Sequence, residues 1–273
     1  MNMFITSLCE HENINGGVSW SRQDGSIYNP IGSSTMDFLN VIGDMYKDIS
    51  RNSIVDNSIK LVMDYYDSKT RQFRYSTKSQ KIPCITAKII SILKKLKIEA
   101  PFYNECYQMF FETQQEDGGW RCATVNLGKS PKTDASNPGT TLYVLDALRY
   151  RENSLGEMKA INKAIEFLLN HWITRKPLGP CEFGIGTTFM KTEYPFYRYN
   201  IFYYVYALSF YDKARKDKRF VEVVSSLKSK ETNTGIKVEN PHKYWKDILF
   251  YNANECNLSN LKYKELLENL SKS

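Results

Sequence analysis

Three cysteines in this chain are of a type and position that could perform chemistry. Cys84 and Cys181 each follow a proline, and Cys122 lies two residues after Trp120. Three thiolates and one imidazole form a common tetrahedral zinc shell. His171, at the end of a predicted helix, is the histidine that we assign to this set. The four residues therefore predict a zinc site, provided that folding brings them together.

A second interpretation of the same cysteines stays open, because free cysteine is often a small buried hydrophobe. Cys106 and Cys256 lie on helical or terminal segments and are expected to serve only in packing. Cys9 and His11 lie near the start of the chain and are reserve ligands.

A helical-hairpin repeat is the element that must position these residues. The clearest copy has an amphipathic helix over 101–113, a turn over 114–119, a loop, and an apolar helix that starts after the N-cap Asn137 and Pro138. The first copy keeps only its inner helix, over 34–46. The second has an outer helix over 55–66 and an inner helix over 83–96, and the fourth has an outer helix over 158–172 and an inner helix over 196–211. A fifth, degenerate copy runs from 219 onward. Asp24 and Asp117, in equivalent turns, are 93 residues apart, or two repeats. Such hairpins bury their apolar faces only by stacking, so the sequence predicts an all-α repeat fold.

The segment Gln115–Trp120, followed by a Thr-x-x-Val-Leu-x-Ala-Leu helix over 141–148, resembles the QxxDGGW repeat of the prenyltransferase and squalene-cyclase (terpenoid cyclase) superfamily. The resemblance implies a single α/α toroid over 1–273 with about five repeats. It also implies that Gln115 and Asp117 brace helix ends and that Trp120 packs between repeats. Asp24 and Asp117 are accordingly interpreted as turn residues rather than catalytic acids.

The toroid that this resemblance implies would gather the loops entering the inner helices at one mouth of the barrel. Cys84, Cys122 and Cys181 belong to three successive loops of this kind, and His171 would reach the same mouth. Protein prenyltransferases hold a catalytic zinc there through Asp, Cys and His. Their Asp-x-Cys pattern is absent from this chain, so the ligand set would differ.

Two acid motifs of terpenoid cyclases are missing. The position of the Asp-x-Asp-Asp acid motif is taken by Asn-Pro-Gly-Thr at 137–140, and no DDxxD metal motif is present. The sequence therefore disfavours cyclisation that starts by protonation.

An aromatic segment near residue 200 is the candidate substrate-binding region. Tyr199, Tyr203 and Tyr206 recur on one face of the predicted helix, and Arg198 lies at its start. Aromatic faces bind apolar chains and cations, and an arginine can clamp an anionic group. Core packing of the tyrosines and an ion pair of Arg198 with Glu193 are the structural alternatives.

Composition narrows the class of protein. The chain has 42% hydrophobic and 25% charged residues and a formal charge of +7. Its basic residues are scattered, so nucleic-acid binding is not expected. It shows no signal-peptide pattern and no long apolar span, so we expect a cytoplasmic protein with reduced thiols.

Two function classes fit the sequence. The first is a prenyltransferase- or terpenoid-cyclase-like transferase that acts on an isoprenoid or another apolar molecule in an aromatic-lined cavity, with zinc as its cofactor if the cysteines bind metal. A zinc-activated thiol alkylation is one form of it. The second is a non-catalytic toroid that binds a peptide or lipid, with a structural metal or none.

Overall fold

The computed structural model describes residues 8–45, 52–122, 131–248 and 256–272. This part of the chain is mostly helical, which confirms the all-α prediction. The long helices are α2 (Thr35–Met45), α3 (Ser53–Met63), α4 (Pro83–Lys95), α5 (Tyr103–Thr113), α7 (Pro138–Leu148), α8 (Leu155–Thr174), α9 (Ile201–Leu208), α11 (Lys218–Lys228) and α13 (Asn257–Leu270). The short ones are α6 (Pro131–Asp134), α10 (Asp212–Arg215) and α12 (Lys243–Ile248). No helix in the described ranges has the length and hydropathy needed to cross a membrane.

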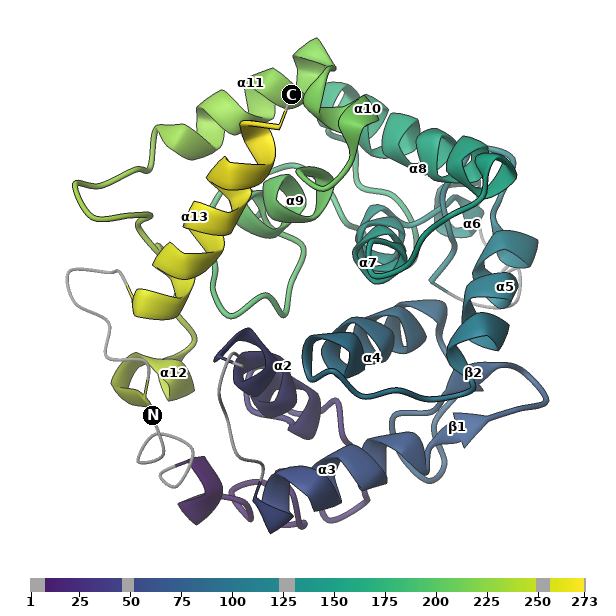
Figure 1. The fold of residues 1–273 in the computed structure, drawn as a ribbon, viewed down its shortest axis with the longest axis vertical. Coiled ribbons are helices and arrows are strands. Elements are labelled where there is room, and N and C mark those ends of the chain that lie inside the picture. Colours follow the sequence, from purple (N-terminus) through teal and green to yellow (C-terminus); the bar gives the residue numbers. More distant parts are fainter. Residues whose placement is uncertain (1–7, 46–51, 123–130, 249–255, 273) are drawn as a thin grey trace.

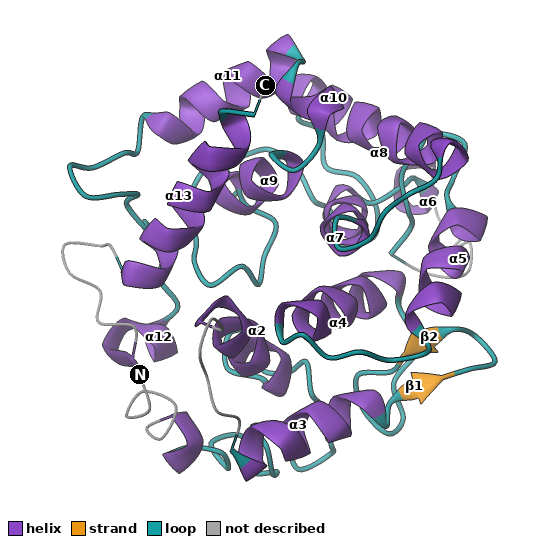
Figure 2. Cartoon of the chain, viewed as in Figure 1, coloured by secondary structure: helices purple, strands orange, loops and turns teal. Residues whose placement is uncertain are grey.

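Four helices, α2, α4, α7 and α9, occupy the inner part of the molecule in chain order (Figure 1). Each contacts the next, and α3, α5, α8 and α11 lie outside them at the periphery. The two short strands β1 (Tyr66–Asp67) and β2 (Gln72–Phe73) pair antiparallel at the edge, as Figure 2 shows. The chain therefore alternates between outer and inner helices from α3 to α9.

Two of the inner helices, α7 and α9, are buried on all sides. Every residue of α7 and of α9 is buried. A helix that is apolar around its whole circumference needs partners on every face, and α4, α8 and α9 supply them for α7. The apolar runs in the sequence therefore mark the inner helices.

The last inner helix, α9, starts five residues later than the sequence predicted. Asn200 has an extended backbone, and its side-chain oxygen accepts hydrogen bonds from Phe202 N and Tyr203 N at 3.0 and 3.1 Å. This N-cap starts the helix at Ile201 and leaves residues 196–199 in the loop. The predicted start at 196 is therefore wrong.

The turn after α5 has the structural role expected for it. Asp117 Oδ1 accepts from Gly119 N at 3.0 Å and from Ser136 Oγ at 2.6 Å. Trp120 is 1% exposed and donates from its indole nitrogen to Phe110 O at 2.7 Å. The turn therefore ties the end of α5 to the segment that enters α7. In the first copy Asp24 likewise accepts from Ser26 N at 3.1 Å.

Candidate functional site

The three predicted thiols lie together at the N-terminal ends of the inner helices. The sulfur atoms of Cys122 and Cys181 are 3.5 Å apart, although the residues are 59 positions apart in sequence. Cys84 lies beside Cys122, close enough for the two thiols to perturb each other's pKa. All three are free thiols. We call Cys84, Cys122 and Cys181 the thiol cluster.

Helix starts hold two members of the cluster. Cys84 is the second residue of α4, which begins at Pro83. Cys122 follows Trp120, whose backbone is fixed to the start of α7: its nitrogen donates to Thr141 Oγ1 at 3.1 Å, and its oxygen accepts from Asn137 N at 2.8 Å. Cys122 is therefore carried on the segment that enters α7.

Two glycines let the loop that carries Cys181 approach the start of α7. Gly179 has a φ of +73°, and a Cβ on it would lie 2.7 Å from Asn137 Nδ2. A Cβ on Gly139 would lie 2.8 Å from the Phe183 ring. Both contacts are too short for a larger residue, so glycine at each position allows the loop to pack here and bring Cys181 to Cys122.

The proton affinities of the three thiols differ. A hydrogen bond from the Cys122 thiol, together with the nearby Lys88 charge, lowers the pKa of Cys84 despite its burial. For Cys122, contact with Cys181 lowers the pKa, but contact with Cys84 and burial together raise it to about 12. Contact with Cys122, and then burial, raise the pKa of Cys181. Cys84 is thus the most acidic thiol of the cluster.

Lys88 is the cation next to the thiol cluster. Its Nζ donates to Tyr197 O at 3.0 Å and lies 4.3 Å from the centre of the Tyr143 ring and 5.2 Å from that of Tyr28. Its charge acts to lower the pKa of the buried Asp37 carboxyl as well as that of the Cys84 thiol. Lys88 therefore stabilises a negatively charged Cys84, although its charge is shared with Asp37.

His171 is held away from the thiol cluster by its own hydrogen bonds. Nδ1 lies 3.0 Å from the Tyr199 hydroxyl, and Nε2 lies 3.0 Å from Lys176 O. The side chain is 2% exposed. Because both ring nitrogens are engaged, neither is free to bind a metal in this arrangement. The role of His171 as the fourth zinc ligand thus stays a prediction that would require these hydrogen bonds to be given up.

Across the described ranges, no three or more His, Cys, Asp or Glu side chains are set ready to hold a metal ion. The thiol cluster is thus a gathering of free thiols rather than a closed coordination shell. The reserve pair is also apart from it: the Cys9 sulfur accepts from Asn52 Nδ2 at 3.0 Å, and His11 is exposed.

Because the His171 side chain is buried, the stability of the protein should depend on pH. Burial lowers its pKa, and hydrogen bonding with the backbone at Lys176 and Phe183 only partly offsets this. The folded state then binds a proton less readily than the unfolded chain. The neutral His171 side chain therefore makes its full contribution to the free energy of unfolding above the pKa of the unfolded chain, about 6.5. This contribution is lost as the pH falls towards the lower pKa that His171 has in the folded state. The loss is about 1.4 kcal/mol for each pKa unit between the two states.

The measurement is urea unfolding between pH 7.5 and 5 of the unmodified chain and of His171→Gln. The variant should lose this part of the pH slope, whereas His11→Gln, at an exposed position, should keep it. Equal slopes in all three proteins would contradict a buried neutral His171.

The predicted substrate-binding tyrosines are buried and hydrogen-bonded. The Tyr199 hydroxyl pairs with His171, Tyr203 donates to Asp146 Oδ2 at 2.9 Å, and Tyr206 donates to Glu265 Oε2 at 2.8 Å. In this structure they therefore pack within the interior. Arg198 is exposed and stacks on Tyr197, with 5.2 Å between its guanidinium carbon and the ring centre.

The cavity between the inner helices is small and partly polar. Its volume is about 20 Å³, which is room for about one water molecule. Its walls include Asp37, Asn40, Lys95 and Tyr203. Phe196 stacks on Tyr203 with 4.9 Å between ring centres and fills the space. This arrangement offers no room for an isoprenoid chain.

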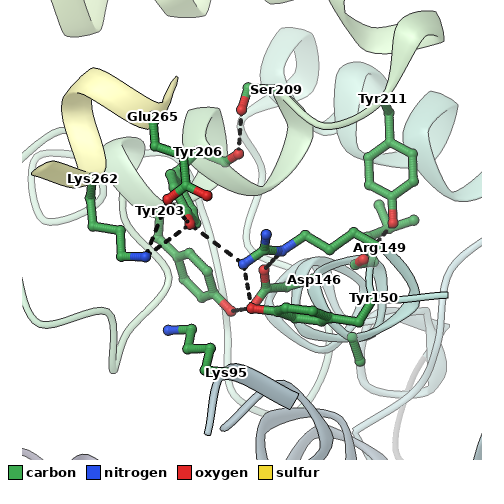
Figure 3. Close-up of polar contacts among 12 residues, drawn as sticks. Lys95, Asp146, Arg149, Tyr150, Tyr203, Tyr206, Ser209, Tyr211, Lys262 and Glu265 are labelled. Atoms are coloured by element: carbon green, nitrogen blue, oxygen red, sulfur yellow. Dashed lines mark hydrogen bonds and ion pairs between the residues drawn. The ribbon is translucent and has the colours of Figure 1, made fainter. Parts of the chain in front are cut away.

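A buried network of charges at the opposite ends of the inner helices was not predicted; Figure 3 shows its part around Asp146, Arg149 and Lys262. Asp44 Oδ1 lies 2.9 Å from Lys95 Nζ and 3.1 Å from Lys262 Nζ, and the Asp44 side chain is 0% exposed. Asp146 Oδ1 accepts from Arg149 Nε at 2.6 Å. The network thus joins α2, α4 and α7 to α13.

The same network reaches α9 through Tyr206. Its hydroxyl accepts from Lys262 Nζ at 3.2 Å and donates to Glu265, and Arg149 Nη2 lies 3.5 Å from it. The sequence held a signal for this network, because Asp44, Lys95 and Asp146 all lie in or next to the last turn of an apolar helix. Charged residues near the ends of buried helices need partners of opposite charge, so these three residues pointed to ion pairs between the helices.

No protein-family model matches the chain, and no curated protein matches it significantly.

Proposed function

We propose that the chain is an α/α toroid of about five helical-hairpin repeats, of the prenyltransferase and terpenoid cyclase kind, and that the thiol cluster is a zinc site at its mouth. The observation that carries the proposal is the contact of Cys122 with Cys181, with Cys84 beside them. These residues come from three successive loops that enter inner helices. The alternation of outer and inner helices and the Gln115–Trp120 turn support the toroid (Figure 1).

The side chains at the cluster suit a thiophilic divalent metal. Three sulfur donors are the ligands that zinc prefers over oxygen-binding metals such as magnesium. Thr140, at the start of α7, lies beside Cys122, and its side-chain hydroxyl acts to lower the pKa of the Cys122 thiol. Cys181 is exposed, so an ion has access from solvent. The thiol cluster is not closed as it stands, so the thiol side chains would have to turn inward to bind the ion.

Zinc bound by three thiolates retains a fourth position, at which it can activate a substrate thiol or water. In that case Cys84, Cys122 and Cys181 hold the ion, and Lys88 offsets part of their negative charge. We propose a transferase that acts on an isoprenoid or another apolar molecule, which approaches the cluster from solvent rather than from the filled interior. A cytoplasmic location would keep the thiols reduced.

The filled interior favours a second candidate function. A toroid with a cavity of about 20 Å³ has no internal room for an apolar substrate. The zinc would then be structural, and the protein would bind a peptide or lipid on its surface. Chelation separates the two cases: loss of a structural zinc lowers the melting temperature, whereas loss of a catalytic zinc leaves it nearly unchanged.

The zinc content of matched cysteine variants tests the proposal. Cys122→Ser should lose most of the metal, because a hydroxyl is a poor zinc ligand beside thiolates. Cys106→Ser removes a thiol that is buried in α5, away from the cluster, and should retain it. The measurement is elemental analysis of protein purified without added chelator. Equal zinc in the two variants, or none in the unmodified chain, would remove the site.

A further inference from the structure

We propose that Cys122 and Cys181 form a reversible disulfide when the thiol cluster meets a peroxide, so that the cluster is a redox-sensitive site. The inference goes beyond the zinc proposal and does not depend on it, because it needs only the two sulfur atoms. Their separation of 3.5 Å must shorten by about 1.5 Å to reach the disulfide bond length.

The placement of the two residues permits this movement. Cys122 and Cys181 both lie outside helices, in loops that meet at the start of α7. Cys84 is held within the first turn of α4, where a shift of its backbone would break helical hydrogen bonds. The sulfur atoms of Cys122 and Cys181 are also in direct contact at 3.5 Å. The geometry therefore selects this pair over one that includes Cys84.

Differences in solvent exposure confine the oxidation to cysteines of the thiol cluster. Cys181 is exposed and Cys122 is half-buried, whereas Cys9, Cys106 and Cys256 are buried. A peroxide therefore reaches Cys181 first, and because contact with Cys122 raises the pKa of this thiol the attack is slow. Oxidation of one thiol in contact with a second one is the arrangement that ends in a disulfide rather than in over-oxidation.

The chemistry balances with one peroxide for each disulfide. The Cys181 sulfur attacks one peroxide oxygen, the O–O bond breaks, and a sulfenic acid and one water form. The Cys122 sulfur then attacks the Cys181 sulfur and displaces the hydroxyl group, which leaves as a second water with the Cys122 proton. Two thiols are oxidised and the peroxide is reduced to two waters. A thiol reductant reverses the reaction by exchange.

The disulfide and a zinc ion exclude each other, because both need the same sulfur atoms. With Cys122 and Cys181 joined, only Cys84 of the three thiols remains. Oxidation would thus release the metal, and bound metal would slow oxidation.

The test uses the full-length protein, stripped of metal and treated with one equivalent of hydrogen peroxide. Intact mass should show the loss of two hydrogen atoms, and peptide mapping without reductant should join the peptides that contain Cys122 and Cys181. Cys84→Ser and Cys106→Ser should still form this link, whereas Cys122→Ser and Cys181→Ser should not. Far-UV circular dichroism should show that each variant is folded, and Cys122→Ala replaces Cys122→Ser if the latter is not.

Three results would overturn the inference: a link between Cys84 and Cys122, oxygen addition at Cys181 without a link, or no reaction. The metal-free design separates this inference from the proposed function. A chain that binds no zinc and still forms the link would leave the redox site standing and remove the zinc site.

Discussion

Replacing Asp44 with alanine is expected to lower the free energy of unfolding by about 3–5 kcal/mol, the range for breaking a buried ion pair. Asp44 is fully buried, with Lys95 at 2.9 Å and Lys262 at 3.1 Å. Burial alone would raise its pKa, but the charges of Lys262 and Lys95 more than offset this and lower it. Without the carboxylate, two ammonium groups remain buried without their main partner.

Urea unfolding at neutral pH measures this effect. Asp24→Ala is the matched control, since Asp24 is 58% exposed and lies 3.7 Å from Arg22. Exposed ion pairs contribute at most about 1 kcal/mol, so the control should change stability little. A loss below about 1 kcal/mol for Asp44→Ala would show that the network does not join the first helices to α13.

Replacing Trp120 with alanine is expected to cost about 3–5 kcal/mol, as for other large-to-small changes of buried aromatic residues. Trp120 is 1% exposed, and its indole nitrogen bonds to Phe110 O. The change removes the largest side chain at the junction of α5 and α7, and this junction positions Cys122. We therefore expect the variant to lose reactivity between Cys122 and Cys181 as well as stability.

Trp120→Phe separates the two contributions. It retains most of the buried ring and loses the indole hydrogen bond, so it should cost about 1–3 kcal/mol. Thermal unfolding of both variants gives the comparison. A cost for Trp120→Ala no larger than that for Trp120→Phe would show that the ring does not fill the space between the helices.

The convergence of the thiols could be predicted from the hypothesis of a helical-hairpin repeat. In a stack of equivalent hairpins, residues that enter successive inner helices become neighbours whatever their separation in sequence. Cys84, Cys122 and Cys181 share that position, and the structure brings them together. The capping signals were equally local: Asn137 and the turn at Asp117 act as the sequence indicated.

The position of His171 could not be predicted in the same way. Its place near the end of an outer helix was read correctly, but its orientation depends on the Tyr199 hydroxyl and on Lys176 O, which lie in a loop with no periodic pattern. The sequence left the choice between a tyrosine-lined cavity and core packing open for a related reason. A stripe of tyrosines is the same in a sequence whether the rings line a space or fill it, and stacking of Phe196 on Tyr203 decides between the two.

The metal content of the unmodified chain tests the central claim most directly. The protein should be purified under reducing conditions without chelator and its zinc measured per chain, with the sulfur ligands counted by X-ray absorption. Our account predicts about one zinc per chain bound by three sulfur atoms, from Cys84, Cys122 and Cys181. A metal-free protein in which these three thiols all react freely with an alkylating reagent would contradict it.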